Sequence, residues 1–498
     1  MDVFVPPSAR HPSSTIRDPS SDIEWTRANV REVLPDVPSP QVMDFLCVTL
    51  NRAERLYAGS LWAPEAELGA ILRVFHGRPY FNVSQLRHIS RLAGSPPARM
   101  FRALGYSGPV DPDDEQTGPR PVRALLRALP ALARVAGYQM RVRSLLHRHL
   151  AVARSRQHQF AGLRVEAMSD AELWAAAREW TDNAAREILP IFVMTGVMAF
   201  EDELRKILDR LGFEYDDLVH PWLAAGGKSV SAQQGFDLLR LAAEARGDPA
   251  AAAYFLDDED LRGYRTRLAG TRFLASLDRF LGDYGHRGPY ESDWALPRFR
   301  DDPSPILACV RTHVRAGEVP DADAIVAEQE RRAREAWDRF EARLSTWQRL
   351  SVRARVRWLV RRIKQMYVWR ELYRSELTKV LAEGRRILLE SSRRFADRGW
   401  IASPGDFFLL TLDEVTSAIE RGDGAAVRAI AEARRRDVAG WRLIEMPLRL
   451  RESELAAIRV GVPRPRHARC ASCAASASAV ASRKPTSSSS TRRTSSAG

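Results

Sequence analysis

The chain has 498 residues, 45% of them apolar, which is enough for several conventional domains or one large helical domain. Four cysteines are too few for a disulfide framework, and no apolar run has the length of a membrane span or of a signal-peptide core, so we expect a cytoplasmic protein with no membrane partner. The formal charge is +13, but seven positive charges and no acid lie in residues 464–498, which argues against a nucleic-acid partner for the remaining body.

The N-terminal half alternates between helical patterns and one short strand signal. Residues 1–20 are rich in Pro, Ser and charge, and we expect them to be disordered. A helix is predicted to begin at Pro40, with Ser39 as its N-cap. The aromatic segment 78–84, "RPYFNVS", is a strand candidate.

Helical spacing of apolar residues continues downstream. It runs through residues 118–163 with an interruption at Pro130. The same pattern occurs again after Ser169, for which Glu172 is the expected capping-box partner. Residues 322–398 contain no proline and predict two long helices joined by a turn near 345–351, ended by Gly399. With only one further strand candidate, "GDFFLLT" at 405–411, the fold class expected is mainly α with few short strands.

Residues 463–498 form a low-complexity tail of Ser, Ala and Arg that cannot build a core. Cys470 and Cys473 make a C-x-x-C pair, but only His467 lies near it, so no metal site is predicted. The abrupt change of composition near 461–466 suggests a change of reading frame, which a continuous open frame in the DNA would contradict.

The loop "YGHRGPYESDWALPRFRDDPSPIL", which begins at Tyr284, collects groups that are costly to bury. Glycines on both sides of His286 and Arg287 allow positive φ, which would direct both side chains to one side. Glu291 and its neighbours can form an arginine–carboxylate network that fixes the loop. The alternative is a polar pocket wall, in which Arg287 binds an anion and His286 exchanges a proton near neutral pH.

A second cluster, "WRELYRSE", lies in the predicted long helix. Arg370 and Arg374 are four residues apart and share one face of the helix, with Glu371 next to them. Ordinary surface charges on an arginine-rich helix would give this pattern, and so would a site for an anionic group. Arg78 and Asn82, in the strand candidate, are further polar residues that could line a pocket.

In order along the chain, several segments resemble the phosphoenolpyruvate synthase-like enzymes that include rifampicin phosphotransferase. The loop from Tyr284 is similar to the family's Y-G-H-R-G…E-D…D-P-S segment, and "WRELYRSEL" is similar to its R-E-x-x-K helix. The other segments that carry the resemblance are "WTRANVREVLPDVPSP" (25–40), "GRPYFNVSQL" (77–86), "GDFFLLTLDEV" (405–415) and "RRRDVAGWRLIEMP" (434–447). The resemblance covers residues 21–462.

This resemblance implies a helical acceptor-binding domain over 21–462, with a small molecule as acceptor. The family's ATP-grasp domain and its domain with a phosphorylated histidine have no counterpart in these motifs, so separate chains are the implied partners for phosphoryl transfer. ATP and Mg²⁺ are implied only with those domains, and the isolated chain is expected to bind without turnover. Arg374 stands where the family pattern has lysine.

The resemblance maps Arg370 and Glu371 onto the family's R-E pair, which is thought to face the transferred phosphoryl group. Together with Arg374 and His286 they are the residues expected at the transfer site. Arg287, Glu291, Arg78 and Asn82 are expected to bind the acceptor as polar groups of its pocket. Two rival hypotheses remain open. One is a non-catalytic binding or scaffold protein on the same helical fold, and the other is nucleic-acid binding through the basic tail, which would be sensitive to salt.

Overall fold

The structure is a computed structural model that describes residues 22–28, 30–61, 69–92, 96–103, 111–115, 122–194, 196–225, 229–257 and 260–458. All of these residues belong to one compact unit. The predictions for residues 1–20 and for the tail with its C-x-x-C pair lie outside the described residues.

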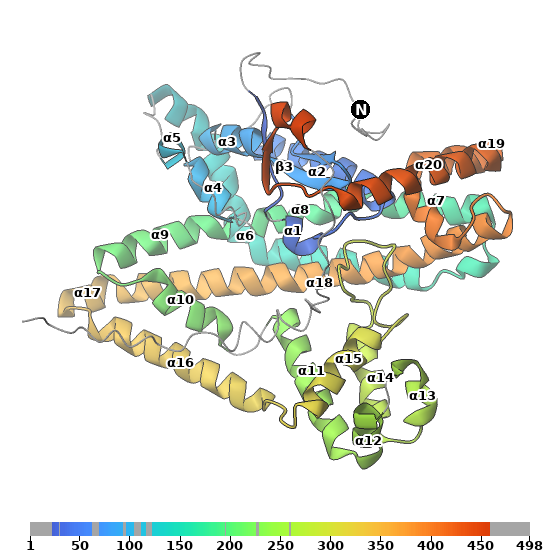
Figure 1. The fold of residues 1–498 in the computed structure, drawn as a ribbon. Helices are drawn as coiled ribbons and strands as arrows, with labels where there is room; N and C mark the ends of the chain where they lie inside the picture. Colours follow the sequence, from blue (N-terminus) through green and yellow to red (C-terminus); the bar gives the residue numbers. More distant parts are fainter. Residues whose placement is uncertain are drawn as a thin grey trace, which may run out of the picture. The chain divides into compact units, whose positions relative to one another are not determined.

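Helices dominate the described chain, so the predicted mainly α class is confirmed (Figure 1). The shorter helices are α1 (Val30–Val33), α3 (Val83–Leu92), α4 (Pro97–Ala103), α5 (Pro112–Glu115), α8 (Ala184–Met194), α9 (Val197–Arg210), α10 (Tyr215–Ala224) and α19 (Leu412–Arg421), and the 3₁₀ helices are η3 (Val165–Ala167), η4 (Leu261–Gly263), η5 (Pro404–Leu409) and η6 (Glu452–Ala457). No described helix has the length and apolar character needed to cross a bilayer.

Four short strands form one antiparallel sheet in the order β2-β3-β1-β4. Its strands are β1 (Glu24–Thr26), β2 (Leu72–Phe75), β3 (Arg78–Asn82) and β4 (Arg449–Arg451). In β1, Trp25 is opposite Asn82 on one side and Leu450 on the other. The predicted strand at 78–84 is therefore confirmed as far as Asn82, and the sheet joins the first and last described segments of the chain.

The other strand prediction, at 405–411, is wrong. Residues Pro404–Leu409 form the 3₁₀ helix η5. Asp406 accepts a hydrogen bond from the backbone N–H of Ser403, and Phe407 and Phe408 are buried against the helices instead of alternating across a sheet. Aromatic content alone suggested a strand, but the local turn chemistry of Ser, Pro and Asp decided the conformation.

Helix α2 (Pro40–Leu61) begins at the predicted proline. The Ser39 carbonyl accepts from the Met43 N–H, whereas the Ser39 hydroxyl donates to Asp293 in the distant loop. Helix α6 (Val122–Ala161) runs through Pro130, so the predicted interruption there is wrong, because the helix tolerates the single missing hydrogen bond. Helix α7 (Asp170–Asp182) begins with the predicted capping box of Ser169 and Glu172.

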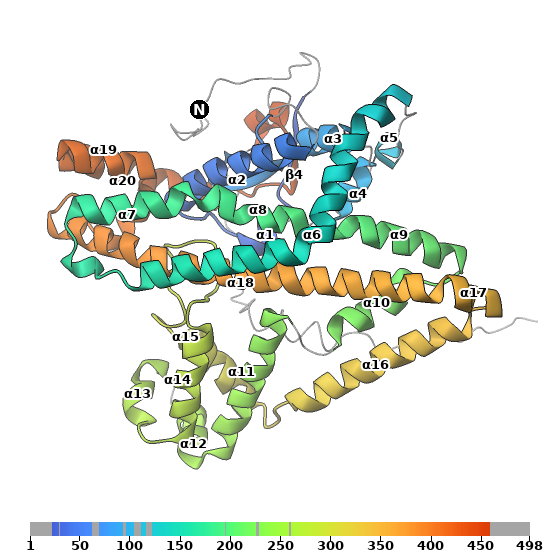
Figure 2. The same ribbon diagram turned by 180° about the vertical axis from the view of Figure 1, so that it is seen from behind.

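The region 322–398 folds as predicted into two long helices, α16 (Ala322–Ala342) and α18 (Arg353–Asp397). The connecting residues form a short helix of their own, α17 (Thr346–Ser351). Gly399 follows α18 with φ of 69°, a left-handed conformation that suits glycine after a helix. Helix α18 contacts α6, α7, α8 and α9 and runs through the main core (Figure 2). Helix α20 (Gly424–Leu443) is near the end of the described chain.

A second core lies within α11 (Val230–Gly247), α12 (Pro249–Asp257), α13 (Tyr264–Arg267), α14 (Arg272–Tyr284) and α15 (Ser304–Arg315). The loop of residues 285–303 joins α14 to α15. Its Trp294 is buried in the main core and its Phe299 in the second one. Because one loop contributes a large side chain to each core, its conformation is fixed from both sides, and this positions the polar residues between them.

Candidate functional site

The two glycines of the loop are required for close backbone contacts. A Cβ atom on Gly285 would lie 2.2 Å from the Leu281 carbonyl oxygen, and one on Gly288 would lie 2.8 Å from that of Pro297. Gly285 has φ of −63°, so the prediction that it uses a positive φ is wrong. The left-handed residue of this loop is Tyr290, with φ of 53°.

Much of the charge in the loop anchors it to the two helices beneath it. Asp293 accepts hydrogen bonds from the N–H and the hydroxyl of Ser39, at 2.8 and 2.7 Å. Arg385 of α18 donates to the Trp294 carbonyl at 2.7 Å and to Asp301 at 2.6 Å. Arg298, which is only 1% exposed, donates to the carbonyls of Glu291 and Asp293, and burial lowers its pKa to about 10. The predicted anchoring network therefore exists.

One carboxylate of the loop, Glu291, connects the two predicted polar clusters. Arg287 donates to its two oxygens at 3.0 and 3.2 Å, and Arg374 of α18 donates to one of them at 3.2 Å. Glu291 is buried, which would raise its pKa, but the hydrogen bonds and charge of Arg287, helped by Arg374, outweigh burial and lower it. The carboxylate is therefore ionised and holds two guanidinium groups next to each other.

Glu371 forms the second junction of the same cluster. Its oxygens lie 3.7 Å from Arg370 and 3.8 Å from Arg374, distances at the long end for ion pairs. The Ser231 hydroxyl, at the start of α11, donates to Glu371 at 3.3 Å and accepts from Arg287 at 3.4 Å. Ser231 was not predicted, because a serine near a helix N-terminus has an obvious capping role. Its proximity to residues 287 and 371 comes from tertiary packing.

His286 lies at the buried side of this group of residues. It is 9% exposed, and its Nε2 atom has no hydrogen-bond partner among the described residues. Burial, reinforced by the positive charges of Lys379 and Arg287, lowers the pKa of His286 to about 4. The imidazole is therefore neutral at neutral pH, and the expectation that it exchanges a proton there does not agree with this pKa. A neutral ring can still accept or donate one hydrogen bond.

The cluster thus contains His286, Arg287, Glu291, Arg370, Glu371 and Arg374 from the predicted site residues, together with Ser231 and Lys379. Arg370 and Arg374 have side chains that are 38% and 44% exposed, whereas that of Arg287 is 12% exposed. Three guanidinium groups surround Glu291 and Glu371, and the charge of Lys379 acts on the neutral His286. The two exposed guanidinium groups therefore offer donors to an anionic group arriving from solvent.

Arg78 and Asn82 lie elsewhere, on β3. Arg78 donates to the carbonyls of His76 and Trp441, at 3.3 and 2.9 Å. The Asn82 side chain donates to the Ala70 carbonyl and accepts from the Gln85 N–H at the start of α3. These contacts stabilise the sheet and its connections to α3 and α20, and they do not bring either residue into the cluster around Glu291.

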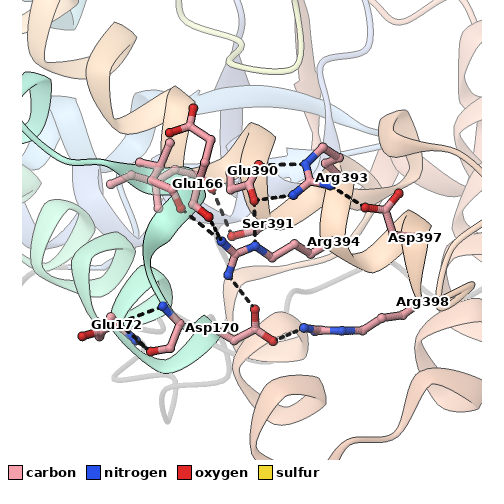
Figure 3. A network of polar contacts seen from close by, with 12 residues as sticks. Glu166, Asp170, Glu172, Glu390, Ser391, Arg393, Arg394, Asp397 and Arg398 are labelled. Carbon is pink, nitrogen blue, oxygen red and sulfur yellow. Dashed lines mark hydrogen bonds and ion pairs between the residues drawn. The ribbon is translucent and has the colours of Figure 1, made fainter.

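A different arginine–carboxylate network lies near the C-terminal end of α18 (Figure 3). Glu390 accepts from Arg393 at 2.7 and 2.9 Å and from Arg394 at 2.7 Å. Arg394 also donates to Asp170 at 2.9 Å and to two backbone carbonyls of η3. This network joins α18 to the start of α7. Among the described residues, no group of three His, Cys, Asp or Glu side chains could hold a metal ion.

Comparison with known families gives a match in the middle of the chain. Residues 187–371 match the sequence model of the rifampicin phosphotransferase fourth domain. The match runs from within α8 through the second core and the loop to Glu371. This part of the chain is therefore a helical domain like that of the phosphoenolpyruvate-utilising, rifampicin phosphotransferase-like proteins. It includes each residue of the cluster except Arg374 and Lys379.

The chain also matches individual curated proteins, at low sequence identity. The chain is 26% identical over 214 residues to the uncharacterized proteins Mb2073c of Mycobacterium bovis and Rv2047c of Mycobacterium tuberculosis. The matched region is 43% of this chain and 22% of each relative, so it covers only about a fifth of their length.

Proposed function

We propose that this chain binds a small acceptor molecule and holds it for phosphoryl transfer at the cluster of Arg370, Glu371, Arg374 and His286. The phosphoryl donor would be a phosphohistidine formed from ATP on domains that other chains provide. The observation that carries the proposal is the junction at Glu291 and Ser231. It joins the loop at 287–291 to α18 at 371–374, although these segments are about 80 residues apart in the sequence.

Each residue has a role that fits its surroundings. Arg370 and Arg374, half exposed, would offset the charge on the oxygens of the transferred group. Glu371 lies within ion-pair distance of both guanidinium groups, and Glu291 orients that of Arg374. Arg287, nearly buried, positions Glu291. Phosphoryl transfer has a loose transition state that requires little removal of the acceptor's proton, so a neutral His286 that accepts a hydrogen bond from an acceptor hydroxyl is sufficient.

Reconstitution tests this proposal. The purified full chain would be mixed with ATP, Mg²⁺ and the isolated nucleotide and histidine domains of a complete family member, with rifampicin and a panel of small alcohols and acids as acceptors. Mass spectrometry would follow phosphorylated product and AMP. We expect product that is lost in Arg370→Ala and retained in Arg361→Ala, a control at an exposed position of the same helix.

The non-catalytic hypothesis predicts a different outcome. A binding or scaffold protein on this fold would bind one panel member saturably and give no product with any donor domain. It would also tolerate Arg370→Ala without loss of affinity. Product formation that is equal in Arg370→Ala and in the unmodified chain would contradict the proposed transfer site.

A further inference from the structure

A cavity separate from the proposed transfer site lies between three helices of the main core. Its volume is about 190 Å³. Helices α2, α7 and α19, which contact one another, form its walls with the first turn of α8. None of the residues of the cluster around Glu291 lines it. Pockets for drug-sized molecules usually measure about 300 to 1,000 Å³, so this cavity suits a smaller ligand.

The lining residues occupy regular positions on their helices. On α2 and α7 they recur at spacings of three, four and seven, which places them on one face of each helix. The apolar lining consists of Phe45, Val48, Trp174, Ala177, Ala185 and Leu412. The small side chains of Ala177 and Ala185, both almost fully buried, leave the space that the indole ring of Trp174 and the ring of Phe45 border.

Two of the three hydroxyl groups in the lining, those of Thr181 and Thr416, are already engaged within the protein. The Thr416 hydroxyl donates to the Leu412 carbonyl and accepts from the Trp174 indole N–H at 2.9 Å. The Thr181 hydroxyl donates to carbonyls of its own helix at 3.1 Å. These two hydroxyls therefore cannot donate to a ligand, which leaves the Thr49 hydroxyl and the charged side chains of the lining for its polar groups.

Charged side chains of both signs surround this apolar space. Arg52, Arg178, Asp182 and Asp413 line the cavity and are exposed to solvent. No ion pair or side-chain hydrogen bond joins these four residues to any other within the part of the chain that the structure describes. Most other arginines near α7 and α18, by contrast, have carboxylate or carbonyl partners. Two guanidinium groups and two carboxylates are thus available at the exposed edge of one small pocket. A third carboxylate of the lining, Asp44, is only 3% exposed and already interacts within the protein.

We propose that this cavity binds a small zwitterion with an apolar side chain, of the class of leucine and phenylalanine. Arg52 and Arg178 would bind its carboxylate, Asp182 and Asp413 its ammonium group, and the apolar lining its side chain. A purely anionic ligand would leave the two carboxylates of the rim uncompensated, and a purely cationic ligand would leave its two guanidinium groups uncompensated. The rim therefore favours a zwitterion. The site is distinct from the proposed transfer site and does not depend on it.

Calorimetric titration of the full chain tests this inference with a defined panel. L-Leucine and L-phenylalanine are the expected ligands. N-acetyl-L-phenylalanine lacks the ammonium charge, L-phenylalanine amide lacks the carboxylate, and glycine lacks the apolar side chain. We expect saturable binding of the two amino acids, with affinity at least about tenfold weaker for each of the three analogues.

Variants locate the binding. Arg178→Ala and Asp413→Asn should each weaken L-phenylalanine binding by about tenfold or more, since each removes a charge-assisted contact. Thr181→Phe, at a partly exposed position of the lining, should abolish binding by filling the space. Two control variants should bind L-phenylalanine as tightly as the unmodified chain does. They are Arg186→Ala, at an exposed position of α8 outside the lining, and Arg374→Ala, in the proposed transfer site.

Thermal unfolding would first show that each variant folds, so that a loss of binding can be attributed to the cavity. Absence of saturable binding for both amino acids at millimolar concentration would overturn the proposal. So would binding that persists in Thr181→Phe, or an affinity for the amide or the N-acetyl compound equal to that for the zwitterion. Loss of phosphoryl transfer in the reconstituted system would leave this result unaffected, because the two sites share no residue.

Discussion

Helix α18 carries two arginine–carboxylate networks that differ in how completely their charges are paired. Near its C-terminal end, Arg394 has Glu390, Asp170 and two backbone carbonyls as partners, with ion-pair distances of 2.7 and 2.9 Å. Near its middle, Arg370 and Arg374 face Glu371 at 3.7 and 3.8 Å, and Arg374 shares Glu291 with Arg287. The same residue types therefore build one closed network and one that is open to solvent.

The extent of charge pairing indicates whether a network mainly stabilises the fold or can also bind a ligand. A network whose donors are all engaged can only hold helices together, and removal of one member breaks several hydrogen bonds at once. A network with long contacts, half-exposed guanidinium groups and a buried imidazole nitrogen without a partner contributes less to stability, but it retains capacity for a ligand. The comparison therefore supports a structural role for Arg394 and the proposed ligand-binding role for Arg370 and Arg374.

The largest effect expected is on the closed network. Arg394→Ala should lower the free energy of unfolding by about 3 kcal/mol, because it removes two charge-assisted hydrogen bonds, to Glu390 and Asp170, and two hydrogen bonds to backbone carbonyls of η3. Chemical denaturation would measure this loss. The matched control is Arg393→Ala, which removes the neighbouring, more exposed partner of the same Glu390 and should cost far less. Equal losses in the two variants would show that the closed network has no special structural role.

His286 gives a pH-dependent test of the open network. Its pKa in the folded chain is about 4, below the usual 6.5 of histidine, so the unfolded chain binds the proton more tightly between these values. Folded stability should therefore fall as the pH drops from 6.5 to 4, by about 3 kcal/mol over that range.

In His286→Gln this part of the pH dependence should be absent. Denaturation at pH 7 and pH 4 would measure the difference between the two chains. The comparison at two pH values separates the titration from any constant effect of the substitution. A slope with pH that is equal in both chains would mean that His286 is not held neutral by its surroundings.

Much of the fold follows from local sequence patterns. The Ser169 and Glu172 capping box, Pro40 at the start of α2 and Gly399 after α18 were each predicted from their own short segments and are confirmed. The wrong predictions at Pro130 and at 405–411 have a common cause. In both, a single local preference was outweighed. The helix-breaking tendency of Pro130 was outweighed by the cooperativity of the 40-residue helix α6. The strand preference of the aromatic residues at 405–411 was outweighed by turn chemistry.

The candidate site could be predicted only in part. The two motifs at 284–291 and 370–374 contain its charged residues, but their meeting at Glu291 depends on Trp294 and Phe299 entering different cores. Ser231 and Lys379 reach the cluster through that packing, and neither has a signal in its own segment. The cavity between α2, α7 and α19 was not predicted either, because lining residues such as Phe45, Trp174 and Ala177 are themselves buried core residues and have the same helical spacing as the rest of the core.

Arg374→Ala should affect binding more than stability. Its side chain is 44% exposed, so we expect the free energy of unfolding to change by less than about 1 kcal/mol. Binding of inorganic phosphate, followed by calorimetry at low salt, should weaken by about tenfold, because one of two accessible guanidinium groups is lost. Arg361→Ala is the control for a general change in charge, and an equal loss of phosphate binding in that variant would contradict a defined anion site.

Substitution of Ser231 should give the smallest effect. It tests how α11, which belongs to the second core, is coupled to α18. Its hydroxyl bridges Glu371 and Arg287 through two long contacts, of 3.3 and 3.4 Å, so Ser231→Ala should leave unfolding unchanged within about 0.5 kcal/mol. Glu371 would lose its orienting donor, and the rate of product formation in the reconstituted system should fall by about threefold, with the acceptor's KM nearly unchanged. Ser231→Thr, which keeps a hydroxyl at this position, should restore the rate. If both substitutions lower the rate equally, the hydroxyl does not orient Glu371, and the contact between α11 and α18 is only a packing contact.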